Sequence, residues 1–312
     1  VAFGAEPTNV TFSTINDTSK VTVQVGGGGV TPITGTEDSI SVDQYKTLVG
    51  EGVLAKLLTV ETVNGVTTFA GVTGGEDTLG TVKATATTDG ALTLIKTDKD
   101  YKSIISELTI EATGDSTSGT KTATAMEAAN SGDKVTNAGT ITVNEHAFGM
   151  VAGAGATAVN SVKEDKSAGI TVNANTANAN TAIGMLAETG ATKSTTTLTN
   201  DGKIAVTKGI GISVTGDGEA EVTFGENGKI EVVSDADNIG INIAGTAKTS
   251  NTTITGGTIE LKGAGTGIKI AGEGTTTVTG AKITLAGAGK GINAEGNVTL
   301  KYLESYLFFN SL

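Results

Sequence analysis

Residues 228–232 read Gly228-Lys229-Ile230-Glu231-Val232, and residues 257–261, Gly257-Thr258-Ile259-Glu260-Leu261, repeat this phrase 29 residues later. Each phrase is a turn residue followed by an apolar-x-apolar segment, in which apolar side chains alternate with polar ones. Such alternation has the period of two that is typical of a strand buried on one face. The phrase therefore predicts a short strand, and its recurrence predicts that one structural unit repeats along the chain.

The phrase recurs from residue 134 onward as the first of three parts. The second part is a glycine followed by an apolar residue, and the third is a Thr-rich strand such as Thr253-Ile254-Thr255. The steps between the isoleucine anchors of the phrase are 29, 34, 26, 29 and 24 residues. A strict hexapeptide solenoid does not allow such drift, whereas a three-strand coil with variable corner turns does. The anchors are Ile141, Ile170, Ile204, Ile230, Ile259 and Ile283.

These features predict an all-β fold, a right-handed parallel β-helix, in which the anchors of successive coils stack inward and rows of threonine lie outside. The Met and Ile residues of the Gly-apolar pairs should also stack inward, and glycine should occupy the corners, where the chain bends sharply and often needs φ > 0. The pairs are Gly149-Met150, Gly184-Met185, Gly211-Ile212, Gly240-Ile241, Gly267-Ile268 and Gly291-Ile292. Because one coil cannot bury its apolar face alone, stability should accumulate by stacking of neighbours.

Residues 1–130 follow a different pattern, and we expect a β-rich region with two short helices. Ser41-Val42-Asp43-Gln44 is a capping-box sequence that predicts a helix containing Tyr45 and Leu48. A second helix is predicted after Thr97, because Tyr101, Ile104, Ile105 and Leu108 have helical spacing. With the strands that follow them, the helices suggest tandem strand-helix-strand units. These units could cap the β-helix or form a separate domain.

The predicted organisation is thus an N-terminal region over 1–130, a parallel β-helix over 131–300 and a distinct tail over 301–312. The tail holds four of the chain's eleven aromatic residues, Tyr302, Tyr306, Phe308 and Phe309, and contains no glycine or threonine. It is interpreted as either a C-terminal cap or a non-native extension.

Composition excludes several classes of function. The 312 residues include no Cys, no Arg and one His, and the formal net charge is −12. A disulfide framework, a thiolate nucleophile and a multi-His metal centre are therefore impossible, and we expect no cofactor. Nucleic acid is an unsuitable partner because the chain is acidic and lacks bidentate guanidinium donors. With no apolar stretch of 18 residues, direct membrane insertion of this chain is not expected.

Three short motifs resemble chemical sites, and each is interpreted as structural. Gly114–Gly119 contains the Gly-Asp-Ser order of a nucleophile turn, but the single His146 follows it in the chain rather than preceding it. His146 itself is expected to be an exposed turn residue. Gly74–Asp77 is too short and irregular for a calcium-binding nonapeptide array.

The paired carboxylates Glu231 and Glu260 were considered more closely, because parallel β-helices include enzymes that cleave polysaccharides. They occupy equivalent positions on consecutive anchor strands, and glycoside hydrolysis needs two nearby carboxyl groups. Lys203 and Lys229 align with Thr258 and Lys282 immediately before the anchors. Because aromatic platforms and Arg are absent or scarce, we interpret the pair as part of a solvated charge ladder and predict no catalytic residue.

The repeats resemble those of a known family of surface proteins. Asn137-Ala138-Gly139-Thr140-Ile141-Thr142-Val143 with Phe148-Gly149-Met150, and Asn180–Met185, are similar to repeats of monomeric autotransporter adhesins, in particular fusobacterial outer-membrane adhesins. The resemblance covers about residues 134–300. It implies a secreted passenger domain, displayed on a Gram-negative cell and anchored by a membrane barrel that is not part of this chain. No ligand-binding residue carries over from it.

Ala182–Ala187 also resembles the head repeats of trimeric autotransporter adhesins, which return about every 14 residues. The steps of 24 to 34 residues favour the monomeric class. We therefore expect a monomeric adhesin that binds a protein or glycan receptor on a host or bacterial cell. Binding is expected in the expanded loops 158–168, 186–196 and 233–238. A β-helix enzyme acting on polysaccharides and a structural surface spacer remain the alternatives.

Overall fold

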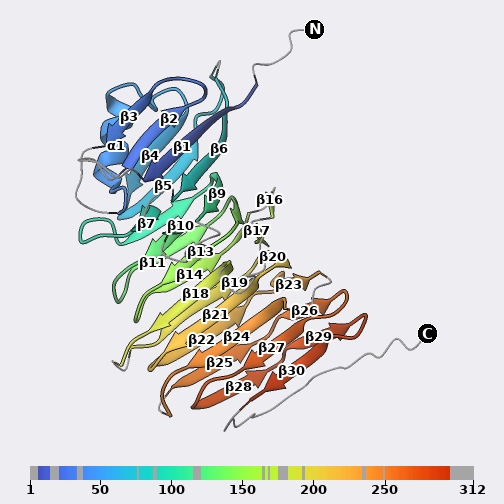
Figure 1. The fold of residues 1–312 in the computed structure, drawn as a ribbon. Helices are drawn as coiled ribbons and strands as arrows, with labels where there is room; N and C mark the ends of the chain where they lie inside the picture. Colours follow the sequence, from blue (N-terminus) through green and yellow to red (C-terminus); the bar gives the residue numbers. More distant parts are fainter. Residues whose placement is uncertain are drawn as a thin grey trace.

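The computed structural model describes residues 6–14, 21–33, 38–75, 77–86, 90–114, 121–163, 166–167, 169–174, 182–191, 194–233, 237–248 and 250–295. Over these residues the chain builds three long sheets whose strands succeed one another along one axis (Figure 1). The tail 301–312, predicted as a cap or a non-native extension, lies outside the described residues.

Sheet A has eleven strands in the described chain, in the order β29-β26-β23-β20-β17-β12-β9-β6-β1-β2-β3. Its strands are β1 (Thr8–Thr14), β2 (Val21–Val25), β3 (Val30–Ile33), β6 (Leu79–Thr85), β9 (Thr109–Thr113), β12 (Thr140–Val143), β17 (Gly169–Asn173), β20 (Lys203–Lys208), β23 (Lys229–Val232), β26 (Thr258–Leu261) and β29 (Lys282–Leu285).

Sheets B and C have eight and nine strands over the same residues. Sheet B contains β7 (Gly90–Lys96), β10 (Lys121–Ala128), β13 (Ala147–Ala152), β18 (Ile183–Thr189), β21 (Ile210–Gly216), β24 (Ile239–Gly245), β27 (Thr266–Ile270) and β30 (Lys290–Ala294). Sheet C contains β4 (Leu58–Val63), β5 (Val66–Gly71), β8 (Ser103–Ser106), β11 (Lys134–Asn137), β14 (Thr157–Asn160), β19 (Thr196–Asn200), β22 (Glu219–Phe224), β25 (Asn251–Thr255) and β28 (Thr275–Thr279).

Each coil contributes one strand to each sheet. The chain passes from β12 in sheet A to β13 in sheet B and β14 in sheet C, and then returns to sheet A in β17. Strands of successive coils pair in parallel in all three sheets. The prediction of a parallel β-helix is confirmed.

The predicted anchors stack in register. Ile230 is the partner of Ile204 on one side and of Ile259 on the other, and the row continues without a break to both ends of the repeats. Three N-terminal strands, β1, β6 and β9, extend it, so that nine residues, each at most 3% exposed, form one inward row. They are Val10, Val82, Ile110, Ile141, Ile170, Ile204, Ile230, Ile259 and Ile283.

The glycine of the second phrase is required by a close approach between coils. In sheet B, Ile210 pairs with Ile239, and Ile212 pairs with Ile241. Gly211 and Gly240 lie between these two pairs. A Cβ on Gly240 would lie 2.6 Å from the carbonyl oxygen of Gly267. The same approach recurs in the coils from Gly149 onward, which explains why glycine returns beside each second anchor.

The predicted helix is α1 (Val42–Gly50), and it lies at the N-terminal end of the three sheets (Figure 1). Its capping box is formed, since the Gln44 backbone N–H donates to Ser41 Oγ and the Ser41 N–H donates to the Gln44 side chain. Tyr45 is buried between Phe12 and Phe69 and contacts both rings edge to face. The distances between ring centroids are 5.6 Å to Phe12 and 5.0 Å to Phe69. The helix thus closes the interior with a large aromatic cluster.

The second predicted helix is wrong, because residues 103–106 form strand β8. Asp98 Oδ1 accepts hydrogen bonds from the N–H groups of Asp100 and Tyr101, which closes a turn instead of starting a helix. Ile104 is buried, whereas its neighbour Ile105 faces outward. β-Branched residues favour such a half-buried strand, and the chance helical spacing of the apolar residues was misleading.

Parallel pairing also begins well before residue 131, the predicted start of the β-helix. Strand β5 pairs with β8, β6 with β9 and β7 with β10, all in parallel. Residues 66–130 therefore contribute coils. Of the two predicted strand-helix-strand units, the first is present as β3, α1 and β4, whereas the second is wrong because β8 replaces its helix. The antiparallel strands β2 and β3 extend sheet A beyond β1, and β4 extends sheet C beyond β5.

A buried asparagine ladder ties three coils together at one corner. Asn137 Nδ2 donates to Asn160 Oδ1 over 3.0 Å, and Asn160 Nδ2 donates to Asn200 Oδ1 over 2.8 Å. All three side chains are fully buried. Burial removes the hydrogen bonds that these amides would make to water, and the hydrogen bonds between neighbouring coils take their place.

Replacing the middle member, Asn160→Ala, is expected to lower the free energy of unfolding by about 2 kcal/mol, because it leaves a buried donor and a buried acceptor unpaired. Urea titration of the full chain measures this loss. The exposed Asn251 is the control, and Asn251→Ala should change stability by less than about 0.5 kcal/mol. Equal losses for the two variants would show that the ladder contributes nothing specific.

Candidate functional site

The two candidate carboxylates lie side by side on the outer face of sheet A. Glu231 and Glu260 are register partners on β23 and β26, as their equivalent positions predicted. The predicted lysine alignment is also confirmed, since Lys203 pairs with Lys229, Lys229 with Thr258 and Thr258 with Lys282. Carboxylates one strand apart are about 4.8 Å apart at the backbone, where like charges repel.

Lysines surround the pair and neutralise it. Glu231 lies 3.4 Å from Lys203 Nζ, 3.5 Å from Lys229 Nζ and 3.1 Å from Lys262 Nζ. Glu260 lies 2.5 Å from Lys229 Nζ. Lys262 was not identified from the sequence, although its position two residues after Glu260 places it beside the same column.

These contacts favour the charged forms of the Glu231 carboxylate and the Lys229 ammonium group. Burial of Glu231 on its own would raise its pKa, but hydrogen bonding and attraction from Lys262 and Lys203 outweigh burial and lower the pKa of this carboxyl. The hydrogen bond to Glu260 raises the pKa of Lys229. A general acid for glycoside hydrolysis needs a raised carboxyl pKa, so the arrangement fits a charge ladder better than a catalytic pair.

The network makes stability depend on pH in a defined direction. Because the pKa of Glu231 is lower in the folded than in the unfolded chain, its contribution is complete at pH 7 and is lost as pH falls through the folded-state pKa. Glu231→Gln should therefore destabilise the chain by about 1 kcal/mol at pH 7, and this difference in stability should disappear once the pH has fallen below the lowered folded-state pKa of Glu231. Thermal unfolding of both proteins from neutral to acidic pH measures this difference. Glu226→Gln, at an exposed turn, is the control and should show no such convergence.

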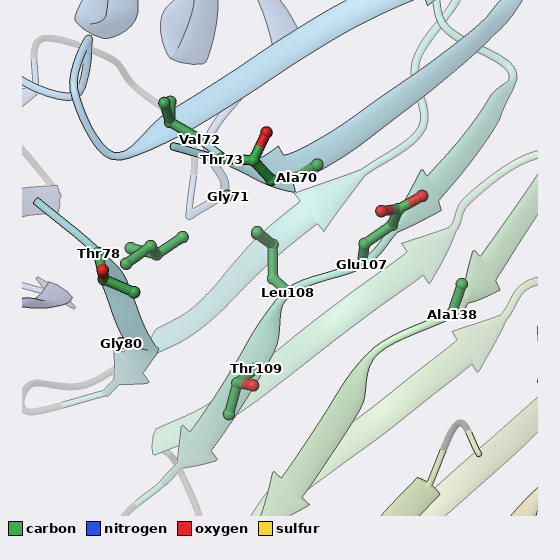
Figure 2. Close-up of a pocket in the computed structure, with 11 residues that line it drawn as sticks. Ala70, Gly71, Val72, Thr73, Thr78, Gly80, Glu107, Leu108, Thr109 and Ala138 are labelled. Atoms are coloured by element: carbon green, nitrogen blue, oxygen red, sulfur yellow. The ribbon is translucent and has the colours of Figure 1, made fainter. Parts of the chain in front are cut away.

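A cavity of about 370 Å³ opens where sheet C turns into sheet A, near the N-terminal end (Figure 2). Its walls come from the end of β5, the start of β6 and the corner between β8 and β9. Glu107 is the one titratable residue among those that line it. With threonine hydroxyls and backbone groups around one carboxylate, the cavity could hold a small polar group, but its lining lacks the second carboxyl that sugar cleavage requires.

A second cavity, of about 500 Å³, lies between the segment before α1 and the ends of β7 and β10. Lys96 and Glu127 line it and form an ion pair of 3.3 Å, and Thr93 Oγ1 donates to the same carboxylate over 3.2 Å. The buried Thr97 also lines this cavity, and its hydroxyl donates a hydrogen bond of 2.7 Å to Asp133. The sequence does not reveal this cavity, because the ion pair in its lining joins residues from different coils.

His146 is buried, and the expectation of an exposed turn residue is wrong. The residue is 9% exposed and has a left-handed backbone with φ of 43°. The turn is held against the preceding coil, since Gly114 N–H donates to Glu145 and Ala123 N–H donates to His146. Coil stacking thus covers a turn that would be exposed in an isolated hairpin.

The other two short motifs are only partly placed. In Gly74–Asp77, Glu76 lies outside the described residues, and so do Asp115–Gly119 of the nucleophile-like turn. Across the part of the chain that the structure does describe, no group of three or more His, Cys, Asp or Glu residues could hold a metal ion.

Two of the three predicted binding loops are shorter than expected, whereas loop 233–238 lies between the end of β23 and the start of β24 as predicted. Strand β14 runs to Asn160 and β18 to Thr189, so both occupy the beginnings of loops 158–168 and 186–196. Between β14 and β17 lies an antiparallel pair, β15 (Val162–Lys163) and β16 (Lys166–Ser167). Residues 164–165, 168, 192–193 and 234–236 of the three loops lie outside the description.

Within the described residues, no helix combines the length and apolar character needed to span a membrane. Comparison of the chain with protein-family models, with curated proteins and with solved structures finds no match.

Proposed function

We propose that this chain is part of a monomeric cell-surface adhesin, a passenger segment displayed outside the outer membrane of a Gram-negative bacterium. The observation that carries the proposal is a long parallel β-helix whose corners differ in length while its ladders stay in register. A rigid scaffold with variable corners is suited to recognition, because binding residues concentrate on loops held by a stable framework.

The composition and the internal contacts fit an extracellular setting. Stability without disulfides has to come from repeated contacts, and the nine-residue anchor row and the asparagine ladder supply them. The sequence resemblance to autotransporter passengers points the same way. The partner class is a protein or glycan receptor on a host or bacterial cell.

Binding of the fluorescently labelled full chain to cultured epithelial cells and to other bacteria tests the proposal. We expect saturable binding that unlabelled chain displaces. Absence of saturable binding to any cell type, together with unchanged attachment of a carrier bacterium that displays the chain, would contradict it. Light scattering should give a monomer of 31.0 kDa, and an obligate trimer would overturn the monomeric assignment.

A structural spacer is the second candidate, and the unbroken ladders favour it. A spacer should tolerate removal of one coil, for example residues 230–258, because Ile204 would then pair with Ile259 in place of Ile230. An adhesin that binds through this part of the chain should lose attachment in the same variant while remaining folded. The salt-bridged state of Glu231 and Glu260 gives no support to the alternative of a polysaccharide-cleaving enzyme at that pair.

A further inference from the structure

Four lysines gather on the outer face of sheet A, over its last four strands. We call Lys203, Lys229, Lys262 and Lys282 the lysine strip. Three of them belong to one register row, in which Thr258 occupies the remaining place. Since neighbouring strands are about 4.8 Å apart, this row extends roughly 14 Å along the axis of the β-helix.

Two ammonium groups of the strip, those of Lys203 and Lys262, are more exposed than the carboxylate that holds them. The side chains of Lys203 and Lys262 are 51% and 47% exposed, whereas that of Glu231 is 14% exposed. Glu231 contacts three lysines at once and Glu260 contacts one. The ammonium groups of Lys203, Lys229 and Lys262 are therefore restrained in position and still partly open to solvent, which reduces the ordering cost of binding an anion.

The charge balance of this face suits an extended anionic partner. Four lysines face two glutamates there, in a chain whose net charge is −12. Asp201 and Glu226 lie in the turns just before Lys203 and Lys229 and weaken the attraction for any anion there. A polymer that meets several ammonium groups together gains from effective concentration, which a monovalent ion does not.

We propose that the lysine strip binds a linear acidic polysaccharide running along the axis of the β-helix. The inference rests on the proposed adhesin function and names the class of its ligand. Sulfate and carboxylate groups recur from sugar to sugar along such a polymer, and a row of lysines recurs from coil to coil. Nucleic acid fits less well, because every basic residue is Lys and Arg forks are absent.

Binding of the full chain to immobilised heparin and to immobilised polygalacturonate tests the proposal, first at about 50 mM NaCl, where screening is weak. The double variant Lys203→Gln/Lys262→Gln should bind at least one of the two polymers about tenfold more weakly than the wild type. Heparin carries sulfate as well as carboxylate, whereas polygalacturonate carries carboxylate alone, so binding of polygalacturonate would show that sulfate is not required. Affinity should fall as salt is raised.

Lys134→Gln/Lys269→Gln is the matched control, because it removes the same charge from sheets C and B. It should change affinity less than about twofold. Equal loss in both double variants, salt-independent binding, or no binding of either polymer at low salt would overturn the proposal. Competition by double-stranded DNA as effective as that by the polysaccharide would also overturn it. Urea unfolding of each variant verifies that the fold is kept.

The same variants separate this inference from the proposed function. If the wild-type chain and Lys203→Gln/Lys262→Gln attach equally well to cells, the adhesin stands and the lysine strip is not its site. If the chain binds heparin through the strip but attaches to no cell, the strip stands and the adhesin proposal fails.

Discussion

Ile259→Asp is expected to lower the free energy of unfolding by about 4 kcal/mol or more, the largest effect of any substitution considered. The side chain is 1% exposed and stacks between Ile230 and Ile283 in the inward row. A carboxylate there has no partner and no water, and it interrupts the stack from both sides. Because each coil is stabilised by its neighbours, protection from hydrogen exchange should fall in β23 and β29 as well as in β26.

Thr258→Asp is the control for this experiment. Thr258 precedes Ile259 on the same strand, faces outward and lies in the register row of Lys229 and Lys282. The same new charge should therefore cost little there. An unchanged thermal midpoint for Ile259→Asp would refute the stacking account of stability.

Gly240→Ala is expected to cost about 3 kcal/mol, although it adds a single methyl group. The new Cβ would lie 2.6 Å from Gly267 O and 3.1 Å from Ile259 Cγ2. The carbonyl belongs to the parallel pair of β24 and β27, and the isoleucine belongs to the inward row. Neither neighbour can withdraw without breaking contacts in its own sheet, so the two coils must separate locally.

Gly169→Ala supplies the comparison, since the nearest heavy atom to its added Cβ is Lys203 O at 3.7 Å, an ordinary contact. This variant should be neutral or slightly stabilised, because alanine restricts the unfolded chain more than glycine does. Urea titration of both variants gives the difference. Comparable losses would mean that flexibility of the unfolded chain, rather than the close approach, determines the effect at Gly240.

The repeated part of the fold could be predicted because its signal is local. Alternation of apolar and polar residues identifies each strand, and the fixed order of three phrases identifies the coil, so both the Ile230 row and the lysine alignment followed from spacing. The helix at Ser41 was predictable for the same reason, since its capping box lies within four residues.

What depends on neighbouring coils could not be predicted. Residues around Ile104 have helical spacing, and their pairing with β5 and β11 decides for a strand. His146 is covered by contacts with an earlier coil. The asparagine ladder was missed because Asn137, Asn160 and Asn200 are separated by unequal steps, and a corner insertion hides their common register. The charge network was partly visible, but Lys262 joins it only through side-chain reach.

The β15–β16 pair shows how this architecture accommodates changes in length. It sits between β14 and β17, yet Asn160 still meets Asn200 and Ile141 still meets Ile170. An insertion at a corner is thus absorbed where it occurs and is not transmitted to the next turn of chain. Evolution can therefore lengthen, shorten or exchange corners one at a time, and it can duplicate whole coils. Each new segment keeps the existing strand register, because its strands pair with those of the neighbouring coils.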